Sequence, residues 1–305
     1  MLIVGLGSIA KKHINALTTL YPNIILYAFR SKKNANVVNG VLNIYSINEL
    51  PDMPDIVIIA TPTHLHALSI QQCLQLKRPM FLEKPLFHSV IAGEPIVQQL
   101  TEQNIITYTA CNLRFHPAII FLKNHLVGKR INEVNVYCGS YLPDWRAGRN
   151  FREIYSANAD QGGGAHIDLI HEIDYIVWLL GNPQHILSVK RNVSSLSISA
   201  IDYATYLLEY PAFTASITLN YYRRDSKRTA EFVFEDDTWT VNLLSGVITG
   251  ANGNTIFHAE QFNMADTYLA QMSYFIDCIK RNEQPMNSAR EALDILNMTL
   301  NDGKS

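Results

Sequence analysis

The sequence predicts an α/β protein with two domains: a doubly wound parallel sheet, then an α/β domain with a large, mostly antiparallel open sheet. Short apolar segments alternate with amphipathic helices up to about residue 117, which is typical of a parallel sheet. A glycine-rich turn joins the first apolar segment to the first helix, as in a Rossmann dinucleotide-binding domain. Beyond residue 118 the hydrophobic residues alternate with a period of two, which indicates antiparallel strands with one covered face. We therefore divide the chain into residues 1–117 and 118–305, and leave open whether the last helix packs back on the first domain.

The composition is that of a soluble globular protein. Of the 305 residues, 48% are hydrophobic and 17% charged, and the net charge is −2, so we expect neither nucleic acid nor a membrane as partner. The spacing of Cys73, Cys111, Cys138 and Cys278 fits neither a zinc site nor a disulfide framework, so we expect reduced thiols and no metal. Without a leader segment or an apolar run of membrane length, we expect a cytoplasmic protein. The first strand is short, so we leave open whether the amino terminus is complete.

The strands expected in the first domain lie at residues 2–4, 24–29, 56–60, 80–82 and 105–108. Residues 56–60 are entirely apolar, which favours a central strand buried on both faces. Pro79 can open the strand at 80–82, because the first residue of a strand tolerates a missing N–H. The helices between the strands are expected around residues 13–17, 67–73 and 91–101.

The second domain is expected to begin with a helix over about 119–126 and a strand over 134–137. A helix over about 165–180 follows three glycines, which allow another backbone to approach closely. The remaining elements are strands at 205–209, 213–222, 229–234 and 238–243 and helices at about 268–280 and 289–300.

The turn Gly5-x-Gly7-x-x-Ala10 has the pattern of a dinucleotide phosphate site. Gly5 permits the tight turn, Gly7 lets the backbone approach the pyrophosphate, and Ala10 lets the helix pack close to the strand. The helix begins at once, so the N–H groups around Ser8 and Ile9 are expected to bind the phosphates.

The second strand does not end in the acidic residue that binds the ribose of NAD. It ends in Phe29-Arg30-Ser31-Lys32-Lys33 instead. A guanidinium with a hydroxyl and ammonium groups suits a 2′-phosphate. NADP(H) is therefore the favoured cofactor, with NAD(H) as the alternative. If this segment has no role in cofactor binding, it is an exposed basic loop.

The tripeptide Glu83-Lys84-Pro85 closes the strand at 80–82, at the edge where open α/β sheets bind ligands. The proline restricts Lys84 to extended geometry, so the lysine is expected to project from the strand tip. An amine held there can exchange a proton with a substrate hydroxyl. Taken alone, a Lys-Pro pair would more simply be a solvated turn. The other motifs of the chain favour a catalytic role for Lys84.

A second constellation follows the three glycines, in the segment GGGAHIDLIHEID at 162–174. Asp168, His171 and Asp174 stand three residues apart, so we expect them along one helical face. A carboxylate beside an imidazole fixes its tautomer and raises its basicity, as a general base requires. His171 and Asp168 are therefore catalytic candidates, and His166 is a wall residue. In isolation, such a motif would be read as a polar face in water.

Together these motifs resemble the Gfo/Idh/MocA (glucose–fructose oxidoreductase, inositol dehydrogenase and MocA) family over nearly the whole chain. The resemblance rests on the glycine turn, Ala60-Thr61-Pro62 with His66, Glu83-Lys84-Pro85, Asn112-Leu113-Arg114-Phe115 and the glycine-run helix. It implies a Rossmann domain joined to an α/β domain whose open sheet forms homodimers or homotetramers. It also implies hydride exchange between a nicotinamide and an alcohol or ketone carbon of a sugar, sugar acid or nucleotide sugar.

By this resemblance, Lys84 looks like the lysine at the reacting hydroxyl, His171 like the acid/base, and Asp168 like the acidic residue before the histidine. Many members place three residues between that aspartate and histidine, and this chain places two, so Asp168 is also a candidate substrate ligand. The residues matched to the cofactor are Thr61, Pro62, His66, Glu83 and Asn112, and those matched to the substrate are Arg114 and Asp174. The helix also looks like the branch found near surface-polysaccharide and sialic-acid-type sugar synthesis.

Aromatic and basic residues gather ahead of the glycine run. Trp145, Arg146 and Arg149 could hold a sugar ring and an acidic group, which favours a nucleotide sugar or sugar acid over a neutral polyol. A second basic cluster comprises Arg223, Arg224, Lys227 and Arg228. For both groups, solvated loops or a subunit contact are the alternatives. Two other functions stay open: an NAD-dependent glycosidase that uses transient oxidation, and a non-catalytic NADP(H)-binding sensor, which would need neither Lys84 nor His171.

Overall fold

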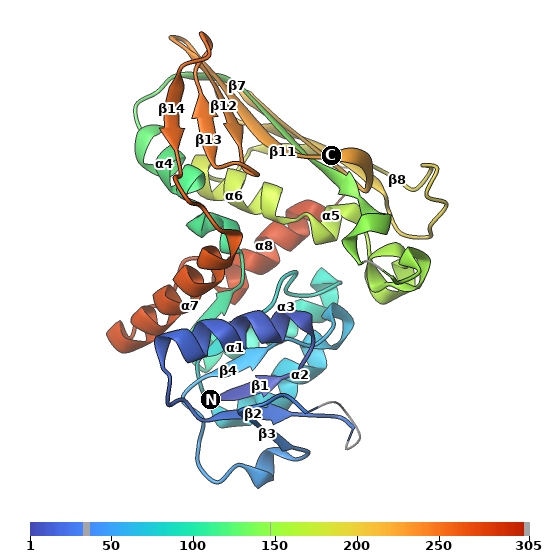
Figure 1. Ribbon diagram of the computed structural model, residues 1–305, viewed down its shortest axis with the longest axis vertical. Helices are drawn as coiled ribbons and strands as arrows, with labels where there is room; N and C mark the ends of the chain where they lie inside the picture. Colours follow the sequence, from blue (N-terminus) through green and yellow to red (C-terminus); the bar gives the residue numbers. More distant parts are fainter. Residues whose placement is uncertain (33–36, 147, 302–305) are drawn as a thin grey trace. The chain divides into compact units, whose positions relative to one another are not determined.

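The computed structural model describes residues 1–32, 37–146 and 148–301 and confirms the predicted α/β class. The chain forms two compact units (Figure 1). The first unit comprises Met1–Asn112 and Met264–Asp294; the second comprises Leu113–Asn263 and the chain from Ile295 onward. The sequence-based division at residues 117 and 118 assigned 264–294 to the second domain. Here that segment belongs to the first unit, because its helix packs against the helix that follows the glycine turn.

A parallel sheet of six strands forms the centre of the first unit, in the order β3-β2-β1-β4-β5-β6. The strands are β1 (Leu2–Val4), β2 (Leu26–Phe29), β3 (Val41–Ile44), β4 (Val57–Ile59), β5 (Met80–Leu82) and β6 (Thr107–Thr109). The sequence analysis missed only β3 of this sheet, a short strand at its edge. The strand order reverses between β1 and β4, and such a switch point is where doubly wound sheets bind ligands at the carboxyl ends of their strands.

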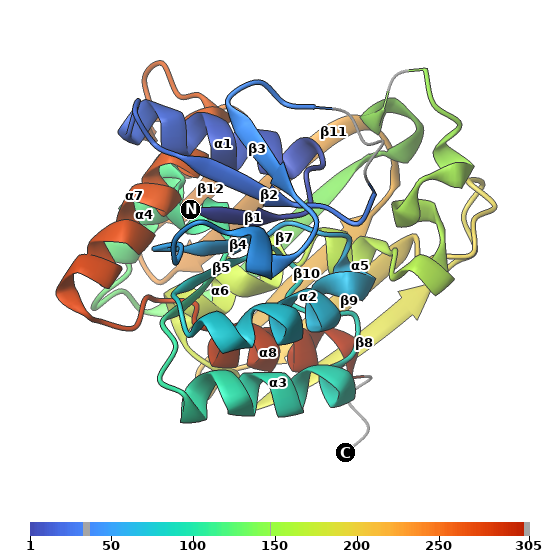
Figure 2. The same cartoon turned by 90° about the horizontal axis from the view of Figure 1, so that it is seen from below.

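Helices cover both faces of this sheet. They are α1 (Ser8–Leu20), α2 (His66–Cys73), α3 (Val90–Glu102) and α7 (Met264–Arg281), with short 3₁₀ turns η1 (Ile47–Glu49), η2 (Thr63–Leu65) and η3 (Leu74–Leu76). Figure 2 shows α1 and α7 on one side of the strands and α2 and α3 on the other, as right-handed crossovers on either side of a switch point require. The core is aromatic: Phe81 of β5 packs edge-to-face on Phe275 of α7, with ring centroids 5.6 Å apart.

The second unit contains a sheet of eight strands in the order β14-β13-β12-β11-β7-β10-β9-β8. The strands are β7 (Ile131–Tyr141), β8 (His185–Arg191), β9 (Tyr203–Glu209), β10 (Thr214–Asn220), β11 (Tyr222–Phe234), β12 (Thr238–Asn242), β13 (Val247–Thr249) and β14 (Thr255–His258). Among the described strands of this sheet, β7 and β10 pair in parallel and the other neighbours are antiparallel, so the sheet is mostly antiparallel as predicted. The sequence analysis missed β8, β13 and β14, which lie in the two edge regions of the sheet.

One face of the eight-stranded sheet is buried and the other is open. The register aligns Val136 of β7 with Ala230 of β11 and Ile217 of β10, and all three are buried. The helices that pack against this sheet or one another are α4 (Pro117–His125), α5 (Ala165–Asp168) and α6 (His171–Leu180), and α8 (Ala289–Leu300) ends in this unit. On the opposite face, Leu187 and Leu207 are paired across β8 and β9 and remain 49% and 37% exposed.

The prediction of a single helix over 165–180 is wrong. The structure has two helices, α5 and α6, and Leu169 between them has φ −99° and ψ 26°. At the junction the backbone forms tighter bonds, from Ile170 N–H to the Ile167 carbonyl and from Glu172 N–H to the Leu169 carbonyl. Asp168 therefore ends one helix and His171 begins the next, and the two do not share a helical face.

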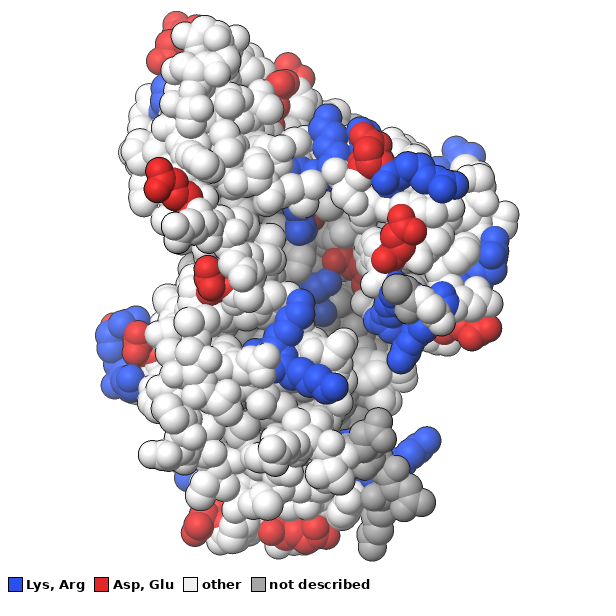
Figure 3. Space-filling model, in the orientation of Figure 1, with Lys and Arg blue, Asp and Glu red and all other residues white. Residues whose placement is uncertain are grey.

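A basic surface would require clustered Lys and Arg side chains, and a membrane-spanning helix would require a long apolar segment. On the face drawn in Figure 3, Lys and Arg side chains lie in small groups, several of them beside Asp or Glu. Within residues 1–32, 37–146 and 148–301, no helix has both the length and the apolar character needed to cross a bilayer. All four cysteines are buried, and none of them forms a disulfide within the described part of the chain.

Candidate active site

Gly5 and Gly7 are glycines for two different reasons. Gly5 follows β1 with φ +87°, and a Cβ there would lie 2.8 Å from the Ala60 carbonyl oxygen and the Thr61 nitrogen of the neighbouring strand's loop. The fold itself therefore excludes a side chain at Gly5. Gly7 has an ordinary φ of −82°, and a Cβ there would meet no described atom within 4 Å. At Gly7 the space that a side chain would fill is left free by the protein.

The amino terminus of α1 opens beside this space. The helix has no side-chain cap and no acidic residue in its first turn. Ser8 is exposed and Ile9 half-buried, whereas Ala10 is fully buried. An uncapped helix start carries free N–H groups and the positive end of the helix dipole, which favour an anion. The residues present therefore fit the pyrophosphate of a dinucleotide.

Arg30 stands directly after β2, where the sequence analysis placed the group that selects the cofactor. It is half-buried, and its Nη1 donates to Oδ1 of Asn43 on β3 at 3.3 Å. Ser31 and Lys32 are exposed. Lys33, the last residue of the predicted basic group, lies outside the described residues. A guanidinium anchored at this strand end fits a phosphate on the adenine ribose.

The loops after β4 and β5 are tied together by His66. Its Nε2 lies 2.8 Å from the Thr61 carbonyl oxygen and its Nδ1 lies 3.0 Å from the Leu86 carbonyl oxygen. Burial lowers the pKa of His66, so the ring is neutral and donates one N–H at a time. Pro62 is exposed beside it. Because the imidazole binds backbone of its own unit, direct contact of His66 with the cofactor stays a prediction.

Glu83 and Asn112 are also engaged within the first unit. The Glu83 carboxylate is buried; its Oε1 lies 2.5 Å from Nε2 of His13 on α1, and its Oε2 accepts the Lys84 backbone N–H at 3.2 Å. Lys84 follows at the end of β5 and is half-buried. Asn112 donates to the Thr267 hydroxyl at 2.7 Å. From the sequence, His13 was expected only to lie in a helix, and its pairing with Glu83 was not predicted.

In the second unit, Asp168 is held by two tyrosines. The Tyr155 hydroxyl donates to Oδ1 at 2.9 Å and the Tyr221 hydroxyl donates to Oδ2 at 2.6 Å. Burial, with the nearby Asp168 charge, raises the pKa of both phenols. Both hydroxyls therefore stay protonated and donate to the two oxygens of Asp168. Neither tyrosine was a candidate from the sequence, because Tyr155 lies in an irregular loop and Tyr221 at a strand end.

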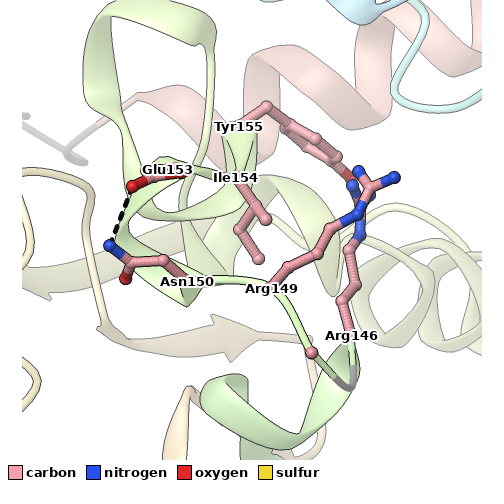
Figure 4. A pocket seen from close by; sticks show the side chains of 7 residues that line it. Arg146, Arg149, Asn150, Glu153, Ile154 and Tyr155 are labelled. Carbon is pink, nitrogen blue, oxygen red and sulfur yellow. Dashed lines mark hydrogen bonds between the residues drawn. The ribbon is translucent and has the colours of Figure 1, made fainter.

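The residues predicted to bind substrate lie around these tyrosines. Trp145, at the end of η5 (Leu142–Trp145), packs edge-to-face on Tyr221 with centroids 5.1 Å apart. The Arg146 guanidinium lies 5.7 Å from the Tyr155 ring centroid. Arg146, Arg149 and Tyr155 line a pocket of about 530 Å³. Figure 4 shows both arginine side chains reaching toward Tyr155, so that their guanidinium groups lie near each other.

The loop that carries this pocket consists of short 3₁₀ turns. After η5 come η6 (Phe151–Glu153), η7 (Tyr155–Ala157) and η8 (Ala159–Gln161), before the glycine run and α5. Asn158 joins them, since its side chain donates to the carbonyl oxygens of Arg152 and Ile154. The described part of the loop is thus built on its own hydrogen bonds.

Two ion pairs, one buried and one partly buried, flank His171, which begins α6 and is half-buried. Arg114 donates to both oxygens of Asp174, at 3.0 and 2.7 Å. Arg228 donates to both oxygens of Glu172, at 2.6 and 3.1 Å. Arg114 and Asp174, both predicted to bind substrate, therefore bind each other, which gives each a structural role, and substrate binding by either stays a prediction.

The second basic cluster is partly accounted for by local contacts. Arg223 pairs with Asp225 at 2.6 Å, and the Arg224 guanidinium lies 3.9 Å from the Tyr141 ring centroid. Arg228 is held by Glu172. The catalytic candidates lie on different units, Lys84 on the first and His171 with Asp168 on the second, and their meeting at one hydroxyl stays a prediction.

Comparison with known proteins identifies both parts of the chain. The profile of the "Oxidoreductase family, NAD-binding Rossmann fold" matches residues 1–110, and that of the "GFO/IDH/MocA C-terminal domain" matches residues 122–243. A levoglucosan dehydrogenase of Pseudarthrobacter phenanthrenivorans is 31% identical over 134 residues, 43% of this chain and 34% of that protein, so this match spans about a third of the relative. A scyllo-inositol 2-dehydrogenase (NAD(+)) of Bacillus subtilis is 24% identical over 307 residues, 93% of this chain and 87% of that protein.

Solved structures share the fold over nearly the whole chain. The WlbA dehydrogenase from Bordetella pertussis, in complex with NADH and UDP-GlcNAcA, superimposes with a TM-score of 0.78. The alignment covers 99% of this chain and 94% of that chain at 18% identity. At this identity the likeness establishes the fold alone.

Proposed function

This chain belongs to the Gfo/Idh/MocA family of oxidoreductases, and from that premise we propose that it is an NADP(H)-preferring dehydrogenase or reductase. Its substrate is a sugar acid or nucleotide sugar, oxidised or reduced at a secondary alcohol or ketone carbon. The observation that carries the substrate class is the pocket of Arg146 and Arg149 beside Tyr155. Two guanidinium groups match a carboxylate or phosphate, which accept bidentate hydrogen bonds, and a neutral polyol offers neither.

The first unit provides the residues for the dinucleotide. The Gly5–Gly7 turn and the start of α1 would hold the pyrophosphate, and Arg30, anchored on Asn43, would bind the 2′-phosphate of NADP(H). The bound nicotinamide supplies the hydride acceptor for oxidation or the hydride donor for reduction. The relatives are named for either cofactor, one for NAD(+) and another for NADP(+), and several of the solved structures contain NADH. The preference for NADP(H) therefore rests on Arg30 alone.

Proton transfer is assigned to Lys84 and His171. A half-buried amine at the end of β5 and a half-buried imidazole at the start of α6 can each take or give the proton of the reacting hydroxyl. Asp168, fixed by Tyr155 and Tyr221, sits three residues before His171 and adjoins the Arg146 pocket through Tyr155. Asp168 would therefore orient the substrate or the histidine. The structural likeness to a dehydrogenase crystallised with UDP-GlcNAcA supports a substrate that joins a nucleotide to a sugar acid.

The test is an absorbance screen at the nicotinamide band, with NADP⁺ and NAD⁺ in parallel. The panel contains nucleotide sugars, nucleotide sugar acids, free sugar acids and neutral polyols. We expect turnover with an anionic sugar and a higher kcat/KM with NADP⁺. Turnover confined to neutral polyols would overturn the substrate class.

Lys84→Ala tests the proton-transfer assignment on the best substrate of that screen. We expect kcat to fall at least about 100-fold, while NADPH affinity, measured by fluorescence, stays within twofold. Lys280→Ala is the matched control, because it removes the same charge from an exposed position of the same unit. If Lys84→Ala turns over like Lys280→Ala, the assignment is wrong.

A homodimer or homotetramer is proposed to form through the open face of the eight-stranded sheet. Leu187 and Leu207 are neighbours there, and Val189 on the same strand is 51% exposed. Contiguous exposed apolar side chains on one sheet face favour a subunit contact. Light scattering of the Leu187→Lys/Leu207→Lys variant should show a smaller particle than the wild type. If the mass were unchanged, the subunits would have to meet at another surface.

A further inference from the structure

We infer that His13 is a positioning residue: it fixes the segment that carries Lys84 by binding the carboxylate of Glu83. The inference rests on the proposed role of Lys84 at the reacting hydroxyl. It concerns a residue of α1 that is fully buried. His13 binds the side chain of Glu83, the residue that precedes Lys84, so its proposed effect on the lysine passes through Glu83.

The Glu83 carboxylate bridges a helix and the backbone of the lysine. One oxygen, Oε1, lies 2.5 Å from Nε2 of His13, and the other, Oε2, accepts the Lys84 backbone N–H at 3.2 Å. Both side chains are buried, so water does not compete for these bonds. The carboxylate therefore adopts the one orientation that satisfies both donors, and that orientation fixes the position of the Lys84 backbone nitrogen.

The pairing with Glu83 is the reason for a histidine at this position. The ring packs edge-to-face on Phe81 with centroids 4.8 Å apart, and it faces Tyr268 with centroids 6.3 Å apart. Its second nitrogen, Nδ1, has no hydrogen-bond partner among the described residues. A phenylalanine or leucine would pack in such surroundings equally well. What an apolar side chain could not supply is the N–H that Glu83 accepts.

A second histidine holds the other end of the same segment. His66 lies 3.0 Å from the Leu86 carbonyl oxygen and 2.8 Å from the Thr61 carbonyl oxygen. Lys84 and Pro85 therefore lie between Glu83, which contacts His13 of α1, and Leu86, whose carbonyl oxygen contacts His66 of α2. These helices belong to opposite faces of the sheet. The lysine segment is thus braced from both faces by buried imidazoles.

The experiment compares His13→Gln with His13→Met. Glutamine keeps a side-chain N–H within reach of Glu83, and methionine has similar length without a donor and adapts well to apolar cores. The direct readout is amide hydrogen exchange at Lys84, followed by NMR on the full chain. We expect the protection of that amide to fall at least about tenfold in His13→Met and less than about threefold in His13→Gln. Equal protection in both variants would overturn the inference.

The catalytic readout uses the anionic sugar that gives the highest turnover in the screen above. We expect His13→Met to lower kcat at least about tenfold, with NADPH affinity unchanged, and His13→Gln to restore most of it. In a Glu83→Gln background, His13→Met should add less than about twofold, because the carboxylate that transmits its effect is gone. Additive losses would mean that His13 acts by packing, and the inference would be wrong.

Two comparisons separate this inference from the function on which it rests. His116→Asn is the control for losing a buried imidazole elsewhere, since His116 binds the Leu243 carbonyl and the Ala118 N–H of the second unit; kcat should be unchanged. If Lys84→Ala keeps normal turnover, the proton-transfer assignment fails whatever His13 does. If Lys84→Ala is inactive and His13→Met keeps normal exchange and kcat, only the inference about His13 fails.

Discussion

Replacing Gly7 with alanine should weaken dinucleotide binding and leave the fold intact. The backbone at Gly7 has φ −82°, which any residue adopts, and the added methyl would meet no described protein atom within 4 Å. It would instead project into the space in front of the first turn of α1. That turn has neither a side-chain cap nor an acidic residue. The proposed occupant of the space is the pyrophosphate.

The magnitude follows from the hydrogen bonds that the methyl would displace. A hydrogen bond from a helix N–H to a charged phosphate contributes about 1.5–3 kcal/mol. Losing one of them raises Kd for NADPH about ten- to 150-fold, because each 1.4 kcal/mol is a factor of ten. The free energy of unfolding without cofactor should not change, since the methyl touches only space that the protein leaves free.

Gly5→Ala is the matched control, two residues away, with the opposite expectation. Its φ of +87° and the Ala60 carbonyl oxygen 2.8 Å from the new Cβ both oppose a side chain. The backbone conformation alone costs about 1–2 kcal/mol. For a unit of this size, that lowers the melting temperature by roughly 2–8 °C, and the contact adds to it.

The assay pairs fluorescence titration with NADPH and thermal melting of the cofactor-free protein. Gly7→Ala should melt with the wild type and bind weakly, whereas Gly5→Ala should melt at a lower temperature. Wild-type affinity in Gly7→Ala would refute the placement of the pyrophosphate. If Gly7→Ala melted at a temperature as low as Gly5→Ala does, the claim that the fold leaves the space at Gly7 free would be refuted.

Three further predictions concern single side chains. Arg30→Ala should raise Kd for NADPH about ten- to 150-fold and leave Kd for NADH within twofold; equal losses would mean that Arg30 does not select the cofactor. Burial lowers the pKa of His116 to about 4, below the unfolded value of about 6.5, so the unfolded chain binds the proton first and stability falls as the pH drops from 6.5 toward 4. The free energy of unfolding should be about 1.4 kcal/mol lower at pH 5.5 than at pH 8. Urea unfolding at both pH values should show this difference in the wild type. The difference should be absent in His116→Asn, in which asparagine still caps α4. Arg114→Leu should destabilise the protein by about 3–5 kcal/mol because it leaves Asp174 buried without a partner; adding Asp174→Leu should recover most of that, and a melting temperature that stays low would contradict this reasoning.

Much of the fold followed from local patterns. The helix at Ala289–Leu300, the strands Leu2–Val4 and Met80–Leu82 and the glycine turn were all placed from their own residues. Hydrophobic periodicity and helix-start signals act over a few neighbouring residues, so they can be read without the rest of the chain. The edge strands Val41–Ile44 and Thr255–His258 were not predicted, because a short, half-exposed strand has too few apolar positions to show a period.

The candidate residues divide in the same way. Gly5, Gly7 and Arg30 could be proposed from the sequence because their expected roles depend on their place relative to adjacent strands and helices, and those roles stay predictions. For Arg114 and Asp174, the sequence indicated charge in the right segments but not that each is the other's partner. Such pairing is decided by packing, since an arginine can bind any carboxylate that the fold buries beside it.

The sequence by itself determined the class of the fold, most of its longer elements and the glycine turn, because these depend on residues next to one another. The tertiary structure alone decided which polar groups meet. His13 and Glu83 are 70 residues apart, Arg114 and Asp174 are 60, and Asp168 and Tyr221 are 53. It also decided the break after Asp168, where two tyrosines hold the carboxylate and one expected helix becomes two. A buried polar group needs a partner, and only the folded chain determines which one it has.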